Sequence, residues 1–424
     1  MVSGLAMTMF LGALVTAVPA AQGARLQDTL LPNVEEARLS TPLPGAAEPY
    51  SQQIIRQSGL QPVVDAFAAQ LPTAAPQTIE QRLEAAGRGL WQSALDNAQG
   101  RNPQYDGDRY EDHGLYWARL SMRMTIKSWV AQNPLALPRL NELLDQFERS
   151  SRGLSELGFT ADPGVAKVMI SGFDPFLLDS RLSMANPSGA AILQLSGRVL
   201  DTPQGPIQVQ AVMLPVTWSG FDAGIVEDAY GPQLQQGPAN AQIAMTISQG
   251  GNRFDIERWA GVWRGGSVDN LNEGVAQGYR QEVPPAAGWP QTRQSPQFIN
   301  TTLPAAQMQA VPTGPYPVNF RQSYCSSSTP ERLDVNCAEG VPAEDAFARA
   351  GSGGDYLSNE SMYRVNCLRE GLGRDDIAGG HLHVPVLSYT GTQSTGSSEQ
   401  FRASRQNVAE QTRELILLAP AAVR

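Results

Sequence analysis

Apolar residues recur at intervals of three and four along the first part of the chain. The pattern is strongest in four stretches, residues 49–71, 77–98, 111–130 and 137–157, which Pro, Gly and Asn separate. This spacing places the apolar side chains on one face of each stretch and predicts about four amphipathic helices. We therefore expect a helical N-terminal region over residues 24–160. It could form a small domain of its own or a helical layer packed on the rest of the chain.

The pattern changes at Gly164. Short runs rich in Val and Ile, at residues 165–173, 206–215 and 240–249, are typical of strands. Helix-like stretches lie between them. One follows Asn186, a favourable N-cap with a proline next to it, and another covers residues 221–230. This alternation indicates an α/β domain over residues 164–424, with a mostly parallel sheet flanked by helices. A last helix at residues 398–418 is expected to cover the sheet.

Residues 305–352 are rich in Pro, Ser and Gly and are too long for an ordinary connection. Two of the three cysteines, Cys325 and Cys337, lie in this segment, and the third is Cys367. In an oxidising compartment Cys325–Cys337 is the natural disulfide, and Cys337–Cys367 is the other plausible one. We interpret the segment as an insertion stapled by a disulfide.

The composition excludes some classes of function. The formal net charge is -10 and no run is rich in Lys or Arg, so a nucleic-acid partner is not expected. The chain has only three histidines, and the cysteine spacing does not resemble a zinc site, so neither a metal nor another cofactor is predicted.

The N-terminus carries an apolar run from Leu5 to Val18, followed by small residues that include Ala21 and Gly23. This is typical of a secretory signal, here residues 1–23; the alternative is a buried N-terminal helix. Export would place the mature protein in the periplasm of a bacterium or outside the cell. No other stretch approaches the length of a membrane span, so no membrane association is expected after the signal is removed.

Five side chains are candidates for chemistry. His381 and His383 lie in a strand-like run, where alternation puts both on the same face. Ser358 lies where an apolar turn leads into a helix; it could be a nucleophile near the free amides of the helix, or simply an N-cap. Glu257 could orient a histidine or be a solvated strand residue. For His113, among the predicted helices, a surface or packing role is the simpler interpretation.

Several short motifs occur in a fixed order. They are SGFDPF (171–176), NPS (186–188), LPV (214–216), GGNRFDIER (250–258), TTLP (301–304), GGDYLSNESMY (353–363) and HLHVP (381–385). Together they resemble the pyroglutamyl-peptidase I family of cysteine peptidases. The resemblance extends from Lys167 to Tyr389. It implies the compact α/β fold of that family and substrates that are peptides with a blocked N-terminus.

The resemblance also implies roles for individual residues. Glu257 would be the acid that orients His383, the general base, and Ser358 stands where the family has its nucleophilic cysteine. The residues implied to bind the substrate are Phe173, Phe176 and Asn186. The chain departs from the family at Leu177 and Leu178, where glycines are usual; these leucines could narrow or reshape the pocket.

The serine allows three interpretations. In the first, Ser358, His383 and Glu257 form a working triad that removes an N-terminal pyroglutamyl or similar group. In the second, the domain is a catalytically inactive relative that binds peptides or a partner. In the third, only the fold remains and the helical region binds a partner. Retention of both Glu257 and His383 favours the first.

Overall fold

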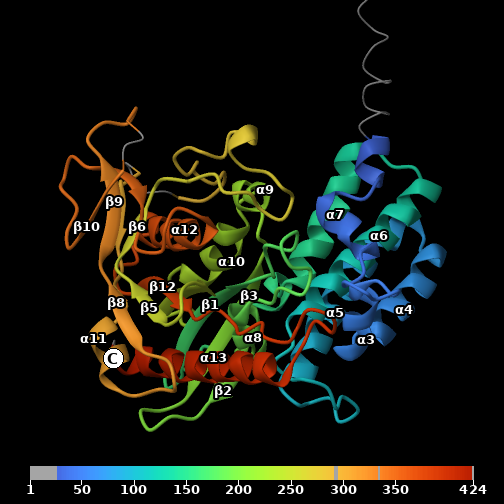
Figure 1. Ribbon diagram of the computed structural model, residues 1–424, viewed down its shortest axis with the longest axis horizontal. Helices are drawn as coiled ribbons and strands as arrows, with labels where there is room; N and C mark the ends of the chain where they lie inside the picture. The colour runs from blue at the N-terminus through green and yellow to red at the C-terminus, as the bar shows by residue number, and fades with distance from the viewer. Residues whose placement is uncertain (1–25, 291–294, 333–334, 423–424) are drawn as a thin grey trace, which may run out of the picture.

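The computed structural model describes residues 26–290, 295–332 and 335–422 (Figure 1). The predicted signal segment, residues 1–23, lies outside the described residues. The described chain has a helical N-terminal region followed by an α/β part with a mostly parallel sheet, which confirms the predicted fold class.

The N-terminal region consists of helices joined by short turns. Its helices are α2 (Val34–Ala37), α3 (Tyr50–Gln57), α4 (Gln61–Gln70), α5 (Ile79–Ala98), α6 (His113–Gln132) and α7 (Leu137–Ser151); its 3₁₀ turns are η1 (Arg38–Ser40), η2 (Leu71–Thr73), η3 (Pro76–Thr78) and η4 (Leu154–Glu156). The predicted helix at residues 49–71 is broken into α3 and α4. Gly59 follows α3 with a φ of 71°, a left-handed conformation that glycine adopts easily and that ends a helix.

A seven-stranded sheet forms the centre of the α/β part, in the order β2-β3-β1-β4-β12-β5-β8. The strands are β1 (Ala166–Phe173), β2 (Val199–Leu200), β3 (Ile207–Leu214), β4 (Ile243–Gln249), β5 (Phe254–Glu257), β8 (Val318–Arg321) and β12 (Ala378–Val384). Strands β3, β1, β4 and β12 are parallel, β5 runs antiparallel to β12, and β2 runs antiparallel to β3.

Helices cover both faces of this sheet (Figure 1). They are α8 (Pro187–Leu195) and α13 (Glu399–Leu418) on one face, and α10 (Ile225–Leu234) and α12 (Leu357–Gly371) on the other. The alternation of β1 explains this arrangement, because Val168 and Ile170 join the first core and Met169 and Phe173 the second. The remaining helical elements are α9 (Trp218–Asp222), α11 (Ala305–Ala310), η5 (Val275–Gln277) and η6 (Ala419–Ala422).

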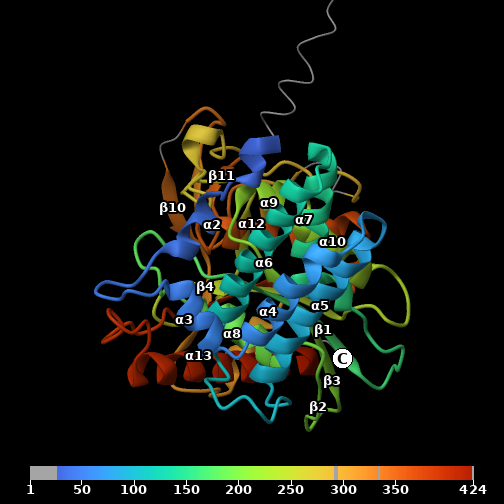
Figure 2. The same cartoon turned by 90° about the vertical axis from the view of Figure 1, so that its right-hand side faces the viewer.

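The helical region packs directly on the α/β part. Figure 2 views the molecule from the side of this region, with α5 in front of the sheet and near α8. One continuous core contains side chains of α5 and α7, such as Leu83 and Leu143, together with Val168 of β1 and Ile192 of α8. Of the two arrangements left open by the sequence, the described structure has the packed helical layer.

The segment predicted as an insertion, residues 305–352, is divided in the structure. Its strand β8 belongs to the main sheet, beside β5, whereas β9 (Ser323–Ser327), β10 (Asn336–Glu339) and β11 (Phe347–Ala350) form a separate three-stranded sheet. Cys325 and Cys337 are opposite each other on β9 and β10 and form a disulfide, and Cys367 is buried in α12. A further two-stranded sheet consists of β6 (Trp259–Gly261) and β7 (Phe298–Asn300).

Within the described ranges, none of the helices combines the length and the apolar character that crossing a bilayer requires.

Candidate active site

Strand pairing brings two of the predicted site residues together. Strand β12 lies between β4 and β5, so its side chains are in the middle of the sheet rather than at an edge. His383 Nδ1 and the Oε1 atom of Glu257 form a hydrogen bond. Glu257 is only 1% exposed and His383 is 6% exposed. The interpretation of Glu257 as a solvated strand residue is therefore wrong, because its carboxylate is buried against an imidazole.

Two glycines make room for this pair. A Cβ atom on Gly250 would lie 2.7 Å from Cγ of His383, and one on Gly353 would lie 2.1 Å from Oε2 of Glu257. Real Cβ atoms do not approach other atoms so closely. The two GG motifs at residues 250 and 353 therefore bring their backbones into contact with the Glu257–His383 pair.

His381 lies beside His383, as the alternation predicted, with ring centroids 4.7 Å apart and the rings nearly perpendicular. Its Nδ1 is 2.7 Å from the hydroxyl of Thr246, and its Nε2 is 2.8 Å from the hydroxyl of Ser248. Burial, together with the neighbouring His383, lowers the pKa of His381 well below its usual value. His381 is thus a neutral imidazole held between two hydroxyl groups, not a polar residue at a sheet edge.

Ser358 is the second residue of α12 and is partly exposed. The N-cap of α12 is Tyr356, so Ser358 is not the cap, although it lies in the first turn with its unpaired amides. The side chains of the two residues after it make hydrogen bonds with other elements. The Asn359 side chain exchanges two hydrogen bonds of 2.8 Å with the backbone of Gly261, and Glu360 accepts one of 2.6 Å from Nε of the buried Arg264.

Ser358 faces a small cavity of about 60 Å³. The residues around it are Phe173, Phe176, Asn186, Val216, Ser248, Gln249, Tyr356, Leu357 and Ser358. The three residues predicted to bind the substrate therefore lie in one cavity with Ser358. Two further lining residues, Ser248 and Gln249, were missed from the sequence, although they directly precede the GG of one quoted motif.

The polar groups of the cavity differ in what they can offer a ligand. Oε1 of Gln249 is buried and has no hydrogen-bond partner among the described residues, so it is a free acceptor. Asn186 is different. Its side chain caps α8 by accepting from the amide of Ser188, as predicted, and its Nδ2 donates to the carbonyl of Asp174. Asn186 therefore shapes the wall, while its amide group is already used within the protein.

Leu177 and Leu178 do not narrow the cavity directly. Leu177 is 48% exposed, and Leu178 is buried in the core that contains the N-terminal helices. Neither side chain lines the cavity.

Ser248 connects the two parts of the site. It lines the cavity with Ser358, and it is the direct neighbour of His383 in the pairing of β4 and β12. Adjacent strands are about 4.8 Å apart, so His383 lies next to the cavity wall. Within the part of the chain that the structure describes, no hydrogen bond joins Ser358 to His383. The structure thus pairs the acid with the imidazole and places the serine in the neighbouring cavity.

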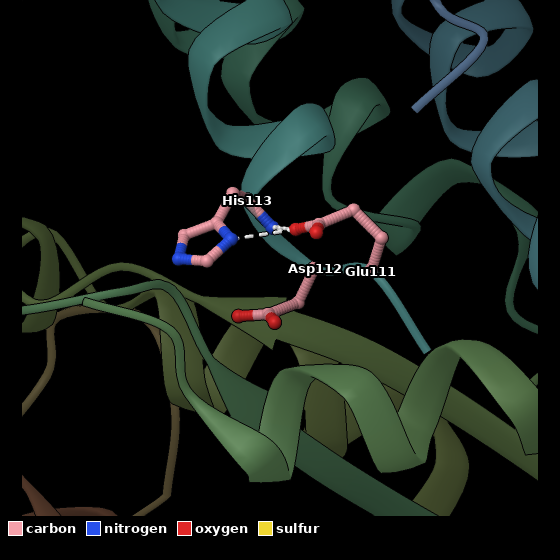
Figure 3. A group of neighbouring side chains, drawn as sticks. All are labelled: Glu111, Asp112 and His113. Carbon is pink, nitrogen blue, oxygen red and sulfur yellow. Dashed lines mark hydrogen bonds and ion pairs between the residues drawn. The ribbon is translucent and has the colours of Figure 1, made fainter. Parts of the chain in front are cut away.

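A second cluster of titratable groups lies at the start of α6 (Figure 3). The ligand atoms of Glu111, Asp112 and His113 are within 4.8 Å of one another. His113 is fully buried, and its ring nitrogens are 2.6 Å from the Glu111 carboxylate and 3.1 Å from the Ser183 carbonyl. Because both partners only accept, the ring carries a proton on each nitrogen and has no lone pair for a metal.

Arg405 completes this cluster. Its guanidinium donates to Asp108 at 2.7 Å, to Glu111 at 3.0 Å and to Asp112 at 3.2 Å. All three carboxylates are therefore paired with Arg405, and Glu111 is also paired with His113. The donor set is that of a buried ion-pair cluster, so the packing role proposed for His113 applies and the surface role is excluded.

Comparison with known proteins gives two kinds of similarity. A family model described as the PA0049 N-terminal domain matches residues 17–148. A second model, described as the PA0049 C-terminal domain, matches residues 167–285 and 319–388. The uncharacterized protein PA0049 of Pseudomonas aeruginosa is 31% identical over an alignment of 487 residues, which covers 90% of this chain and 88% of the relative.

Solved structures are more distantly similar. A mutant form of the pyrrolidone carboxyl peptidase of the hyperthermophile Pyrococcus furiosus aligns at 18% identity with a TM-score of 0.40, covering 61% of this chain and 100% of that chain. Pyroglutamyl peptidase I of Bacillus amyloliquefaciens aligns at 18% identity with a TM-score of 0.38, covering 60% and 97%. Since both PA0049 domain models match, and together span more than half of the sequence, the chain belongs to the PA0049 family.

Proposed function

We propose that this protein is a hydrolase that removes an N-terminal pyroglutamyl or similar group from peptides, with Ser358 as nucleophile, His383 as general base and Glu257 as the orienting acid. The observation that carries the proposal is the buried Glu257–His383 pair beside a cavity that contains Ser358. The order of sequence motifs that resembles the pyroglutamyl-peptidase I family supports the same assignment.

The chemistry follows from the tautomer of His383. A carboxylate only accepts hydrogen bonds, so Nδ1 carries the proton and Nε2 is left with a lone pair. Nε2 would take the proton of the Ser358 hydroxyl as its oxygen attacks the carbonyl carbon of the substrate. The amides of the first turn of α12 would bind the developing oxyanion. His383 would then give the proton to the leaving amine, and a water molecule would hydrolyse the acyl-enzyme by the same steps.

The cavity suits a small, flat group with few polar contacts. Its aromatic and aliphatic side chains, Phe173, Phe176, Val216 and Leu357, would enclose an apolar ring, and Oε1 of Gln249 would accept a hydrogen bond from the ring N–H. A pyrrolidone ring has this combination. The partners we propose are therefore peptides with a blocked N-terminus.

A second function is favoured by one observation. The hydroxyl of Ser358 makes no hydrogen bond with an imidazole among the described residues, and a hydroxyl is a much weaker acid than the thiol it would replace. The alternative is that the cavity binds the N-terminal end of a peptide without cleaving it.

We also propose that the protein is exported to the periplasm or secreted. The disulfide between Cys325 and Cys337 supports this location, because such bonds persist mainly in oxidising compartments.

The experiment is hydrolysis of a fluorogenic pyroglutamyl amide by the purified protein, next to the variants Ser358→Ala, Ser358→Cys and His383→Ala. Cleavage by the wild type that is lost in both alanine variants would support the serine hydrolase. A silent wild type with an active Ser358→Cys variant would favour the binding protein. If neither cleaves, the assignment of this substrate class is wrong.

A further inference from the structure

The loop that forms one wall of the cavity is bonded both to the α/β part, through Asn270 and Tyr389, and to the helical N-terminal region. We call it the wall segment, residues Asp174–Asn186, between the end of β1 and the start of α8. Phe176 and Asn186, both in this segment, line the cavity. Its partners in the helical N-terminal region include charged side chains.

The first anchor is Asp174, which lies between Phe173 and Phe176. Its carboxylate accepts hydrogen bonds from Nη1 of Arg119 on α6, at 2.9 Å and 3.1 Å, and from Nη1 of Arg152 at the end of α7, at 2.6 Å. Asp174 is 1% exposed, Arg119 0% and Arg152 4%. Charge pairs with so little solvent access are strongly coupled, and removing one partner leaves an uncompensated buried charge.

Other anchors hold the middle and the far end of the wall segment. Arg38 of η1 donates from Nε to Asp179 at 2.7 Å. At the end before α8, Asp112 accepts from the backbone amide of Asn186 at 2.7 Å. Together with the contact of His113 with the Ser183 carbonyl, the helical region contacts the wall segment at four points along its length.

The backbone of the wall segment includes a conformation that needs such support. Leu177 has a φ of 58°, in the left-handed region that non-glycine residues rarely adopt. A residue in this region persists when its surroundings hold it there. Leu178, next to it, is buried in the core shared with the N-terminal helices. The turn between Phe176 and Asp179 is thus shaped against the helical region.

We propose that the helical N-terminal region is a working part of the binding site, with Arg119, Arg152 and Asp112 as positioning residues that set the wall segment and thereby the shape of the cavity. The inference rests on the proposed function as far as the ligand is concerned. The helical region is then neither a separate module nor a spacer, since its side chains hold the segment that carries Phe176 and Asn186.

The test compares two variants of the full chain. Asp174→Asn keeps the shape of the side chain and removes the charge that Arg119 and Arg152 bind. Arg149→Met is the matched control, because Arg149 of α7 also crosses to the α/β part, where it pairs with Asp228 on α10, but it does not contact the wall segment. Hydrogen exchange of the backbone amides of residues 176–186 is measured in both, with kcat and KM for the fluorogenic pyroglutamyl amide.

We expect Asp174→Asn to speed exchange in the wall segment by about tenfold or more, since hydrogen bonds to charged groups are lost, and to raise KM more than it lowers kcat. Arg149→Met should leave the exchange rates and the kinetic constants unchanged. Equal exchange in the two variants would overturn the proposal, and so would a fall in kcat alone. If circular dichroism shows that Asp174→Asn does not fold, Asp112→Asn takes its place with the same expected results. A wild type that does not cleave the substrate would refute the proposed function, whereas the exchange experiment would still decide the role of the helical region.

Discussion

Glu257 is directly opposite His381 in the pairing of β5 and β12, yet its carboxylate bonds to His383, the next residue on the same face. Because Glu257 bonds diagonally to His383, His381 bonds instead to Thr246 and Ser248 on β4, and the two imidazoles have separate partners. One is held by an anion and the other by neutral hydroxyl groups. In the proposed reaction, His383 is the imidazole that acts as a base, and His381 is its neutral neighbour.

The first prediction concerns Glu257. In Glu257→Gln the amide group can donate to Nδ1 of His383, which would move the ring proton to Nε2 and remove the lone pair that the reaction needs. We expect kcat for the pyroglutamyl amide to fall about 10³- to 10⁴-fold with little change in KM. The control is Asp255→Asn, two residues earlier on β5, whose carboxylate pairs with Arg253 and Asn319. Similar losses in both variants would show that the acid acts through the fold and not through His383.

The second prediction uses two neighbouring glycines. Gly250→Ala would bring a methyl group to within 2.7 Å of His383, whereas an added Cβ on Gly251 meets nothing within 4 Å. We expect the first variant to lose most of the activity and about 1–3 kcal/mol of unfolding free energy, as overpacking usually costs. The second should resemble the wild type in urea denaturation and in kcat. Equal behaviour of the two would contradict the contact between Gly250 and His383.

The sequence was sufficient for features that depend on local periodicity. The period of two along β12 placed His381 and His383 on one face, and Asn186 followed by Pro187 marked the start of α8. Both follow from a few consecutive residues. The mostly parallel sheet followed from the alternation of strand-like and helix-like segments.

Features that depend on distant residues could not be predicted. The sequence makes Ser358 a possible cap, but the N-cap of α12 is Tyr356. The first turn of α12 is accompanied by contacts of Asn359 with β6 and of Glu360 with Arg264, about a hundred residues away. Strand β8 is only four residues long in a segment rich in Pro and Ser, and its pairing with β5 is what gives it a place in the sheet. The role of Asp174 also depends on distant residues, because its sequence context is that of a loop and its ion pairs are with Arg119 and Arg152.

The third prediction concerns stability in acid. The pKa of His381 is lowered by burial and by His383, so the folded protein keeps this ring neutral where the unfolded chain would bind a proton. The contribution of His381 to stability is therefore present above pH 6.5 and is lost as the pH falls below that value. We expect His381→Gln, which cannot titrate, to lose less unfolding free energy than the wild type between pH 6.5 and 5. Urea denaturation at several pH values measures the difference. If the unfolding free energies of the two proteins depend on pH in the same way, His381 is protonated in the folded state.

The fourth prediction has the opposite sign and concerns His113. Burial disfavours its charge, and Arg405 does so too, but the attraction of Glu111 and Asp112 together outweighs them, so the pKa of His113 is raised above its usual 6.5. The folded state then holds a proton that the unfolded chain releases near pH 6.5, so this stabilisation is complete below that pH and is lost as the pH rises through the raised pKa.

Each unit of that pKa difference corresponds to about 1.4 kcal/mol at pH values below 6.5. We expect the unfolding free energy of the wild type to fall between pH 6.5 and 9, and His113→Gln to be less stable at pH 6 but to show a flatter slope over this range. The matched control is His381→Gln, which should keep the alkaline slope of the wild type. If His113→Gln has the same alkaline slope as the wild type, the ring is neutral in the folded protein. The Ser183 carbonyl would then be bonded to an uncharged imidazole.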